Sequence, residues 1–138
     1  MTDDTSTRKF TDMDAMRLKD SMARFEGVCV VATVNPDGTP DASIFMPAMP
    51  DPEHVILILA DNHTRANIER TGKARLVYDV PNPHAEDKAG RHAGARIELS
   101  LVRPEGDSAE EFRRVAQNVP HMNPAVMVLR IERLLPVG

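Results

Sequence analysis

An apolar run that ends in a tight turn constrains the fold of this chain more than any other feature. Val28–Val34 is almost entirely apolar, and Asn35-Pro36-Asp37-Gly38 follows it at once. Because proline presets one backbone torsion and glycine accepts a positive φ, this sequence favours a hairpin turn between two strands. Apolar residues at consecutive positions are typical of a central strand or of a strand covered on both faces. The segment therefore predicts the middle of a β-sheet.

Five further strands are expected from apolar runs and from alternation of apolar with polar residues. They are Ala42–Met46, Val55–Ala60, Ala74–Val80, the segment around Ile97–Leu101, and Val126–Leu134. The proline-rich segment 47–52 is expected to be a loop, and so is the polar segment 81–94. Six strands at short intervals predict a mainly β fold, a small antiparallel barrel with flanking helices. A βαβ fold would need more regular helical crossovers.

Three helices are expected beside the strands. The first is amphipathic and is expected to end at Gly27, with one face formed by Ala15, Leu18, Met22 and Phe25. The second follows the third strand and covers residues 64–71, with Asn62 or Thr64 as its cap and Gly72 as its stop. The third begins at Ser108 and Glu111, which have the spacing of a capping box.

Composition and charge exclude several classes of protein. A length of 138 residues suits one domain, which we expect over residues 11–138, after a flexible tail at 1–10. The net charge of −4 argues against a nucleic-acid partner. No apolar stretch approaches the length of about 20 residues that spans a bilayer, so no membrane partner is expected.

The single cysteine and the start of the chain indicate the compartment. Cys29 lies within an apolar strand, where a small buried side chain is expected rather than a reactive thiol, and it excludes an internal disulfide framework. The first residues are acidic and contain no apolar signal region. The expected location is the cytoplasm.

The second helix begins with residues that suit a bound phosphate. A helix N-terminus offers free N–H groups and a partial positive charge, and His63 and Thr64 add further donors there. In the alternative, Thr64 only caps the helix, His63 is exposed and nothing binds. The strand at 42–46 has the same two interpretations: its backbone and Ser43 contact a flat heterocycle, or it is an ordinary hairpin strand.

Other kinds of site find no support in the sequence. The five histidines are scattered without metal-ligand spacing, so no metal site is expected. No G-x-S-x-G elbow marks a nucleophile, and neither a dinucleotide-binding glycine fingerprint nor a Walker sequence is present.

The elements, taken in order, resemble the pyridoxamine 5′-phosphate oxidase-like family of split β-barrel flavoproteins, and more narrowly its small FMN-binding proteins. The resemblance covers roughly residues 14–134, and the matching segments are 27–33, 37–40, 63–68 and 74–80. It implies a six-stranded antiparallel split barrel of the FMN-binding type. It also implies a homodimer with FMN at the interface.

The same resemblance implies the cofactor contacts. The ring would pack along the second and third strands, and the phosphate would meet the helix start, where Arg65 adds charge. The residues expected to bind FMN are Ser43, Ile44, Phe45, Leu59, Ala60, His63, Thr64 and Arg65. The flavin would supply the redox chemistry, so no catalytic side chain is expected.

The chain also departs from the family pattern. Family members often carry Arg or Lys on the second strand and at the helix start, where this chain has Ser43 and His63. Histidine is only partly charged near neutral pH, so weaker, pH-sensitive phosphate binding is expected. The C-terminal motif of true pyridoxamine-phosphate oxidases contains a tryptophan, and this chain has none. Oxidation of pyridoxamine phosphate is therefore not expected.

Two functions remain open. One is a flavin-dependent oxidoreductase or electron carrier. The other is a non-catalytic dimeric small-ligand-binding protein on the same fold that has lost flavin. A haem-binding relative is a form of the second, and no motif selects its ligand among His63, His84, His92 and His121.

Overall fold

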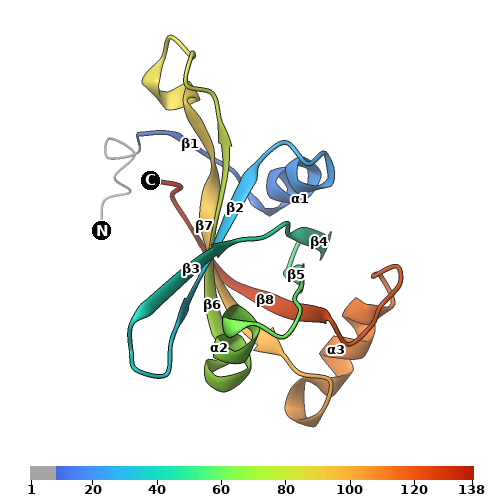
Figure 1. Ribbon diagram of the computed structural model, residues 1–138. Coiled ribbons are helices and arrows are strands. Elements are labelled where there is room, and N and C mark those ends of the chain that lie inside the picture. The colour runs from blue at the N-terminus through green and yellow to red at the C-terminus, as the bar shows by residue number, and fades with distance from the viewer. Residues whose placement is uncertain (1–8) are drawn as a thin grey trace, which may run out of the picture.

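A computed structural model describes residues 9–138 as a strongly curled sheet with helices around it (Figure 1). Within these residues lie eight strands and three α-helices. The strands are β1 (Thr11–Asp12), β2 (Val28–Val34), β3 (Pro40–Ile44), β4 (Ala48–Asp51), β5 (His54–Ile58), β6 (Lys73–Pro81), β7 (His92–Val102) and β8 (Val126–Leu135). The predicted class, mainly β with flanking helices, is confirmed. The predicted flexible tail lies largely outside the described residues.

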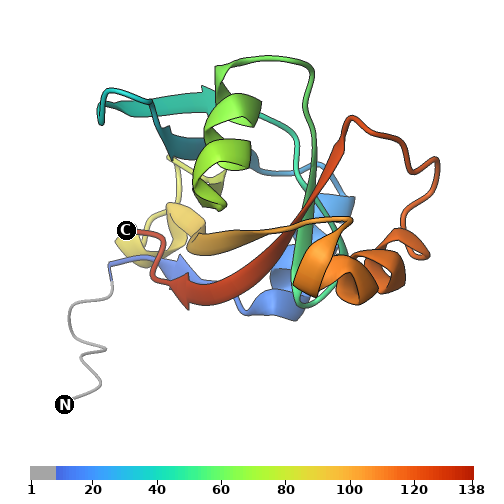
Figure 2. The same ribbon diagram turned by 90° about the horizontal axis from the view of Figure 1, so that it is seen from below.

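The sheet runs in the order β3-β2-β6-β7-β8-β5-β4, and β1 adds to β7. Neighbours on this path are antiparallel, whereas β1 runs parallel to β7 at Ala93 and Gly94. Strand β5, from the middle of the chain, pairs with β8, which lies near the end of the chain. The sheet as a whole is curled (Figure 2). All six predicted strands are present.

Two strands were not expected from the sequence. One is β1, and the other is β4, in the segment interpreted as a proline-rich loop. Pro50 is compatible with β4 because this strand pairs with β5 alone and so lies at the edge of the sheet. The predicted loop at 81–94 is also shorter than expected, since the β6–β7 ladder extends to the pair Pro81 and His92.

Strand β2 is covered on one face only. Cys29, Val31 and Thr33 point into the core, whereas Val28 is 53% and Val34 49% exposed. Of the two predicted alternatives, the central strand is confirmed, because β2 pairs with both β3 and β6, and coverage of both faces is not seen within this chain. Burial raises the pKa of the Cys29 thiol to about 12, so this cysteine is the inert, buried side chain that was expected.

Helix α1 (Ala15–Ala23) begins at Asp14, whose side chain accepts a hydrogen bond from the Arg17 N–H at 2.9 Å. It ends before the predicted stop, and Phe25 has the left-handed φ of 53° that terminates the segment. Gly27 has a different role. A Cβ at this position would lie 2.3 Å from Cζ of the Tyr78 ring, so only glycine fits.

Helix α2 (His63–Thr71) has the cap and the stop that its sequence predicts. The Asn62 side chain accepts from the Arg65 N–H at 2.9 Å, and Gly72 ends the helix at φ 71°. Of the two alternatives for the cap, Asn62 is therefore correct. Thr64 is buried and points inward.

Helix α3 (Ala109–Ala116) does not form the predicted capping box. A short 3₁₀ turn, η3 (Gly106–Ser108), precedes it, and the Ser108 hydroxyl instead accepts from the Arg103 N–H at 2.8 Å. The Glu111 side chain points away from the helix start, toward Arg130 and His54. Both members of the predicted pair have partners in other parts of the chain.

The interior is divided into two clusters. The main cluster lies inside the curled sheet and under α1 and α2, and includes Leu18, Val31, Ile68 and Tyr78. A second, smaller cluster lies under α3 and consists of Val102, Val115, Val119, Val126 and Val128. Among the described residues no helix is long and apolar enough to cross a bilayer.

Candidate functional site

The predicted cofactor residues lie in two places. Leu59, Ala60 and the start of α2 form one group at the junction that follows β5. Ser43, Ile44 and Phe45 form the other, at the end of β3, which is separated from β5 in the sheet order by β2, β6, β7 and β8. The structure therefore places the expected phosphate residues directly after Leu59 and Ala60, and the second-strand residues on a strand that does not pair with β5.

The β5–α2 junction has an open hollow of about 410 Å³. Its lining includes Asn62, His63 and Ala66, and the exposed residues Ile58 and Ala60 immediately precede it in the chain. The first N–H groups of a helix have no acceptor within the helix, and the Asn62 side chain accepts from the Arg65 N–H, so the N–H groups of His63 and Thr64 are available to an anion here. The hollow combines an exposed apolar approach with donors for a negatively charged group.

Two predicted phosphate ligands are placed less favourably. Thr64 is buried, so its hydroxyl faces the protein interior. Arg65 donates to the Leu59 carbonyl and to the Pro124 carbonyl, each at 2.9 Å, and pairs with Glu69 at 3.2 Å. Its guanidinium joins α2 to the loop before β8. The anion-binding role then falls on His63 and the backbone, in a hollow that Asp61 and Glu69 also line.

The end of β3 presents apolar surface. Ile44 is 77% exposed, while Phe45 packs partly against the main core and Ser43 is half-buried. Ile44, Phe45 and Met46 line a hollow of about 250 Å³ together with Phe25 and Val28. Large apolar side chains gathered at one open position are typical of a surface that another molecule covers.

Polar contacts of the buried Asn67 and the exposed Arg70 fix α2 on the sheet, and no sequence pattern predicted them. The Asn67 amide donates to the Thr33 hydroxyl at 3.1 Å and to the Asn35 side chain at 2.9 Å. Arg70 donates to the Asn67 side-chain oxygen at 3.0 Å and to the Val34 carbonyl. These bonds hold the middle and last turn of α2 against the end of β2, and the start of the same helix lines the hollow.

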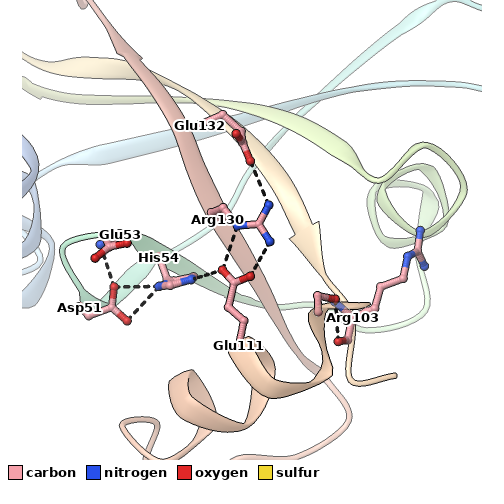
Figure 3. Close-up of polar contacts among 8 residues, drawn as sticks. Asp51, Glu53, His54, Arg103, Glu111, Arg130 and Glu132 are labelled. Carbon is pink, nitrogen blue, oxygen red and sulfur yellow. Dashed lines mark hydrogen bonds and ion pairs between the residues drawn. The ribbon is translucent and has the colours of Figure 1, made fainter. Parts of the chain in front are cut away.

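A second polar cluster lies away from these groups, between β4, β5, β8 and α3 (Figure 3). His54 contacts Asp51 through one ring nitrogen at 2.9 Å and Glu111 through the other at 2.7 Å. Arg130 contacts both oxygens of Glu111 and pairs with Glu132 at 3.2 Å. The contacts that join the cluster are distant in sequence, since Glu111 lies 57 residues from His54 and 19 from Arg130, so no motif could have predicted it.

Comparison with known proteins identifies the family. The family model described as pyridoxamine 5′-phosphate oxidase matches residues 18–136. We found no match among curated protein sequences.

Solved structures share the fold at low sequence identity. An FMN-binding protein from Syntrophomonas wolfei subsp. wolfei superposes with a TM-score of 0.59 at 19% identity, over 90% of this chain and 86% of that one. HupZ from Group A Streptococcus gives 0.57 at 24% identity, over 91% and 97%. HutZ, the haem storage protein from Vibrio cholerae, gives 0.50 at 12% identity, over 86% and 89%.

The match extends over most of the chain, and the superposed structures have the same curled sheet with flanking helices. At these identities the structural likeness establishes the fold, while the sequence match establishes the relationship. The chain therefore belongs to the pyridoxamine 5′-phosphate oxidase family and has its split-barrel fold.

Proposed function

We propose that this protein binds FMN and acts as a flavin-dependent oxidoreductase or electron carrier. The observation that carries the proposal is the β5–α2 junction, where the exposed residues Ile58 and Ala60 lead into a hollow lined by Asn62 and His63. FMN combines an apolar ring with a phosphate, and this junction combines an apolar approach with a helix N-terminus. Relatives described as FMN-binding support the same ligand.

The chain's own residues would bind the cofactor and orient it. The phosphate would accept from the first N–H groups of α2 and from His63, and the apolar residues would pack on the ring. The redox chemistry belongs to the bound flavin, so the protein contributes binding, orientation and exclusion of water. No side chain is assigned to catalysis.

We further propose that the working form is a homodimer. The outer face of β2 and β3 is apolar, with Val28, Val34 and Ile44 exposed and Val30 paired opposite Ile44. Beside it, Glu98 of β7 contacts Arg75 and Arg133, each at 2.8 Å. An apolar centre with a charged rim fits a protein partner, and a second copy offers the same face in return.

The test is a titration with FMN and with riboflavin, which lacks the phosphate, followed through the fluorescence of the flavin. FMN should bind more tightly than riboflavin. Replacing His63 with alanine should weaken FMN binding about tenfold, because a hydrogen bond to a charged group is lost, and should leave riboflavin binding unchanged. The matched control is His84→Ala, which removes an exposed histidine from the β6–β7 loop.

A protein that neither binds FMN nor gains thermal stability from it would contradict the proposal. Equal affinities for FMN and riboflavin would agree with flavin binding but contradict the assignment of the phosphate to the start of α2.

A second candidate is a dimeric small-ligand-binding protein that has lost flavin. The engagement of Arg65 by backbone carbonyls favours it, and so do the carboxylates of Asp61 and Glu69 in the hollow. Haem is one possible ligand under this second function, because one structural relative is described as a haem storage protein. A Soret band on addition of haem, without any response to FMN, would select this function.

A further inference from the structure

Helix α3 is a small unit with its own support. It has eight residues, a length at which an isolated helix is marginal in water. Its apolar side chains Phe112 and Val115 pack on the valine cluster and not on the main core. Figure 2 shows α3 and the loop that follows it at one side of the sheet, apart from α2. Its docked position therefore depends on few contacts.

One side chain of α3 makes its polar attachment. Glu111 points from the helix toward the sheet, where Arg130 of β8 and His54 of β5 both contact its carboxylate (Figure 3). His54 in turn contacts Asp51 at the end of β4. Glu111 and His54 thus connect α3 with three strands of the sheet.

The geometry of His54 requires two protons on its ring. Nδ1 lies 2.9 and 3.0 Å from the Asp51 oxygens, and Nε2 lies 2.7 Å from Glu111 Oε2. An ionised carboxylate only accepts hydrogen bonds, and a neutral imidazole has a single N–H. Both contacts exist together only while His54 is an imidazolium. Because its side chain is 9% exposed, water offers little replacement for a lost contact.

The surrounding charges keep Glu111 ionised. Asp51, Glu53, Glu111 and Arg114 line one pocket with His54, and Arg130, which pairs with Glu132, contacts the same Glu111 carboxylate. The Arg130 guanidinium, with a smaller contribution from His54, lowers the pKa of Glu111 to about 2, against the effect of its burial. Burial alone would lower the pKa of His54, but the hydrogen bonds with Glu111 and Asp51 outweigh burial and raise it.

We propose that α3 is a flap whose docking on the β4–β5 hairpin is controlled by one proton on His54. With the proton, the imidazolium binds both carboxylates and the flap is closed. Without it, one ring nitrogen presents a lone pair to a carboxylate oxygen, and α3 loosens from the sheet. His54 is the group that titrates, because Glu111 stays ionised.

Opening of the flap has a defined structural consequence. A cleft of about 450 Å³ lies between α2 and α3, with walls that include Arg65, Glu69, Leu101, Phe112 and Met122. Phe112 belongs to α3, and Met122 to the loop that follows it. Movement of α3 would therefore remove one wall of the cleft and uncover the valine cluster. Loss of the His54 proton would open both to solvent.

The direction of the pH dependence follows from the raised pKa of His54 in the closed state. Below about pH 6.5, the ordinary histidine value, His54 is protonated whether the flap is open or closed, and docking is at full strength. Between this value and the raised pKa, opening becomes up to about tenfold more favourable for each pH unit. Above the raised pKa, the equilibrium constant for opening no longer changes with pH.

Amide hydrogen exchange of residues 109–116 measures the opening, after correction for the intrinsic pH dependence of exchange. In the wild-type protein, protection of α3 should fall as the pH rises above about 6.5, while α2 and the central strands stay protected. The His54 ring, followed by NMR, should titrate over the same range. A His54 that titrates at or below about 6.5, or α3 protection that is equal at pH 6 and pH 9, would overturn the proposal.

Two variants separate the proton from general destabilisation. Asp51→Asn removes one charged partner of His54 and so lowers the pKa of His54 in the closed state. Protection of α3 should then stop falling at a lower pH than in the wild-type protein. His54→Gln should give weak protection without pH dependence. His84→Gln, which changes an exposed histidine, should behave as wild type. Retention of the full pH dependence in His54→Gln would assign it to another group. This inference and its test do not depend on FMN binding.

Discussion

Gly27 lies directly against the ring of Tyr78, a fully buried side chain of β6. The Tyr78 hydroxyl lies 2.6 Å from the Ser21 hydroxyl of α1, so the end of the ring that lies against Gly27 is held in place. A ring fixed in this way cannot move aside for an added methyl group. The contact thus sets how closely the chain passes between α1 and β2.

Gly27→Ala should lower the free energy of unfolding by about 1–3 kcal/mol, the range for overpacking a close-packed core. Urea denaturation measures the change. The matched control is Gly90→Ala, because a Cβ there would lie 3.4 Å from its nearest neighbour, the Ala85 Cβ. A Gly27 variant as stable as the control would show that the ring of Tyr78 can shift.

At the residue scale, the sequence predicts chemistry where partners are local and fails where they are distant. The apolar setting of Cys29 was sufficient to predict an inert thiol. The partners of Arg65 were not predictable, because the Pro124 carbonyl comes from a loop 59 residues away. The contact of His54 with Glu111 spans 57 residues. Roles of this kind are decided by the folded topology.

At the scale of elements, α2 depends on a local signal that can be tested alone. The Asn62 side chain satisfies the Arg65 N–H at the start of the helix. Asn62→Ala should therefore lower the free energy of unfolding by about 1 kcal/mol, the usual contribution of an N-cap. Thermal or urea unfolding gives the measurement, with Asn82→Ala, an exposed asparagine of the β6–β7 loop, as the control. An equal effect of the two variants would argue against a capping role for Asn62.

The capping pattern at Ser108 and Glu111 shows why the same kind of signal failed elsewhere. A capping box needs both side chains to turn back on the helix start. Ser108 is held by Arg103, and Glu111 is drawn to Arg130 and His54 by opposite charge. A neighbouring loop residue engages Ser108 and distant charged residues engage Glu111, so the predicted motif does not form. Strand β4 was not predicted because its prolines indicated a loop. The strand can contain proline because it pairs with β5 alone, at the edge of the sheet.

At the scale of the whole molecule, the proposed homodimer can be tested at the outer face of β2 and β3. Ile44→Asp would bury an unpaired charge from each protomer in the apolar interface of the proposed homodimer, which costs several kcal/mol. The dimer should weaken by roughly 100-fold or more, as measured by sedimentation equilibrium. Met16→Asp is the control, since Met16 is an exposed apolar residue of α1 and not of this face. A wild-type protein that is monomeric at micromolar concentration would contradict the proposed homodimer.

The class of fold was predictable as a whole because its signals are periodic and repeated. Alternation along Ala74–Val80 and 97–101, together with the turn at 35–38, was sufficient to predict a mainly β domain. The position of the candidate site was predictable only in part, because the two groups of predicted cofactor residues lie at or just after the ends of β3 and β5, which are not neighbours in the sheet. No single stretch of sequence specifies how the curled sheet places these two strands relative to each other.

The strand β1 has a practical consequence for work with this molecule. Its pairing with β7 places the Asp12 side chain 3.0 Å from the Val137 backbone N–H, so the two described ends of the chain meet beside the same strand. Thr11 also donates to the Ala89 carbonyl in the β6–β7 loop. A label or surface tether attached at Gly138 would therefore emerge beside β1 and β7. In Figure 1 the C-terminus and α2 lie at opposite ends of the strands, so a tether at Gly138 would leave the β5–α2 junction open to the solution.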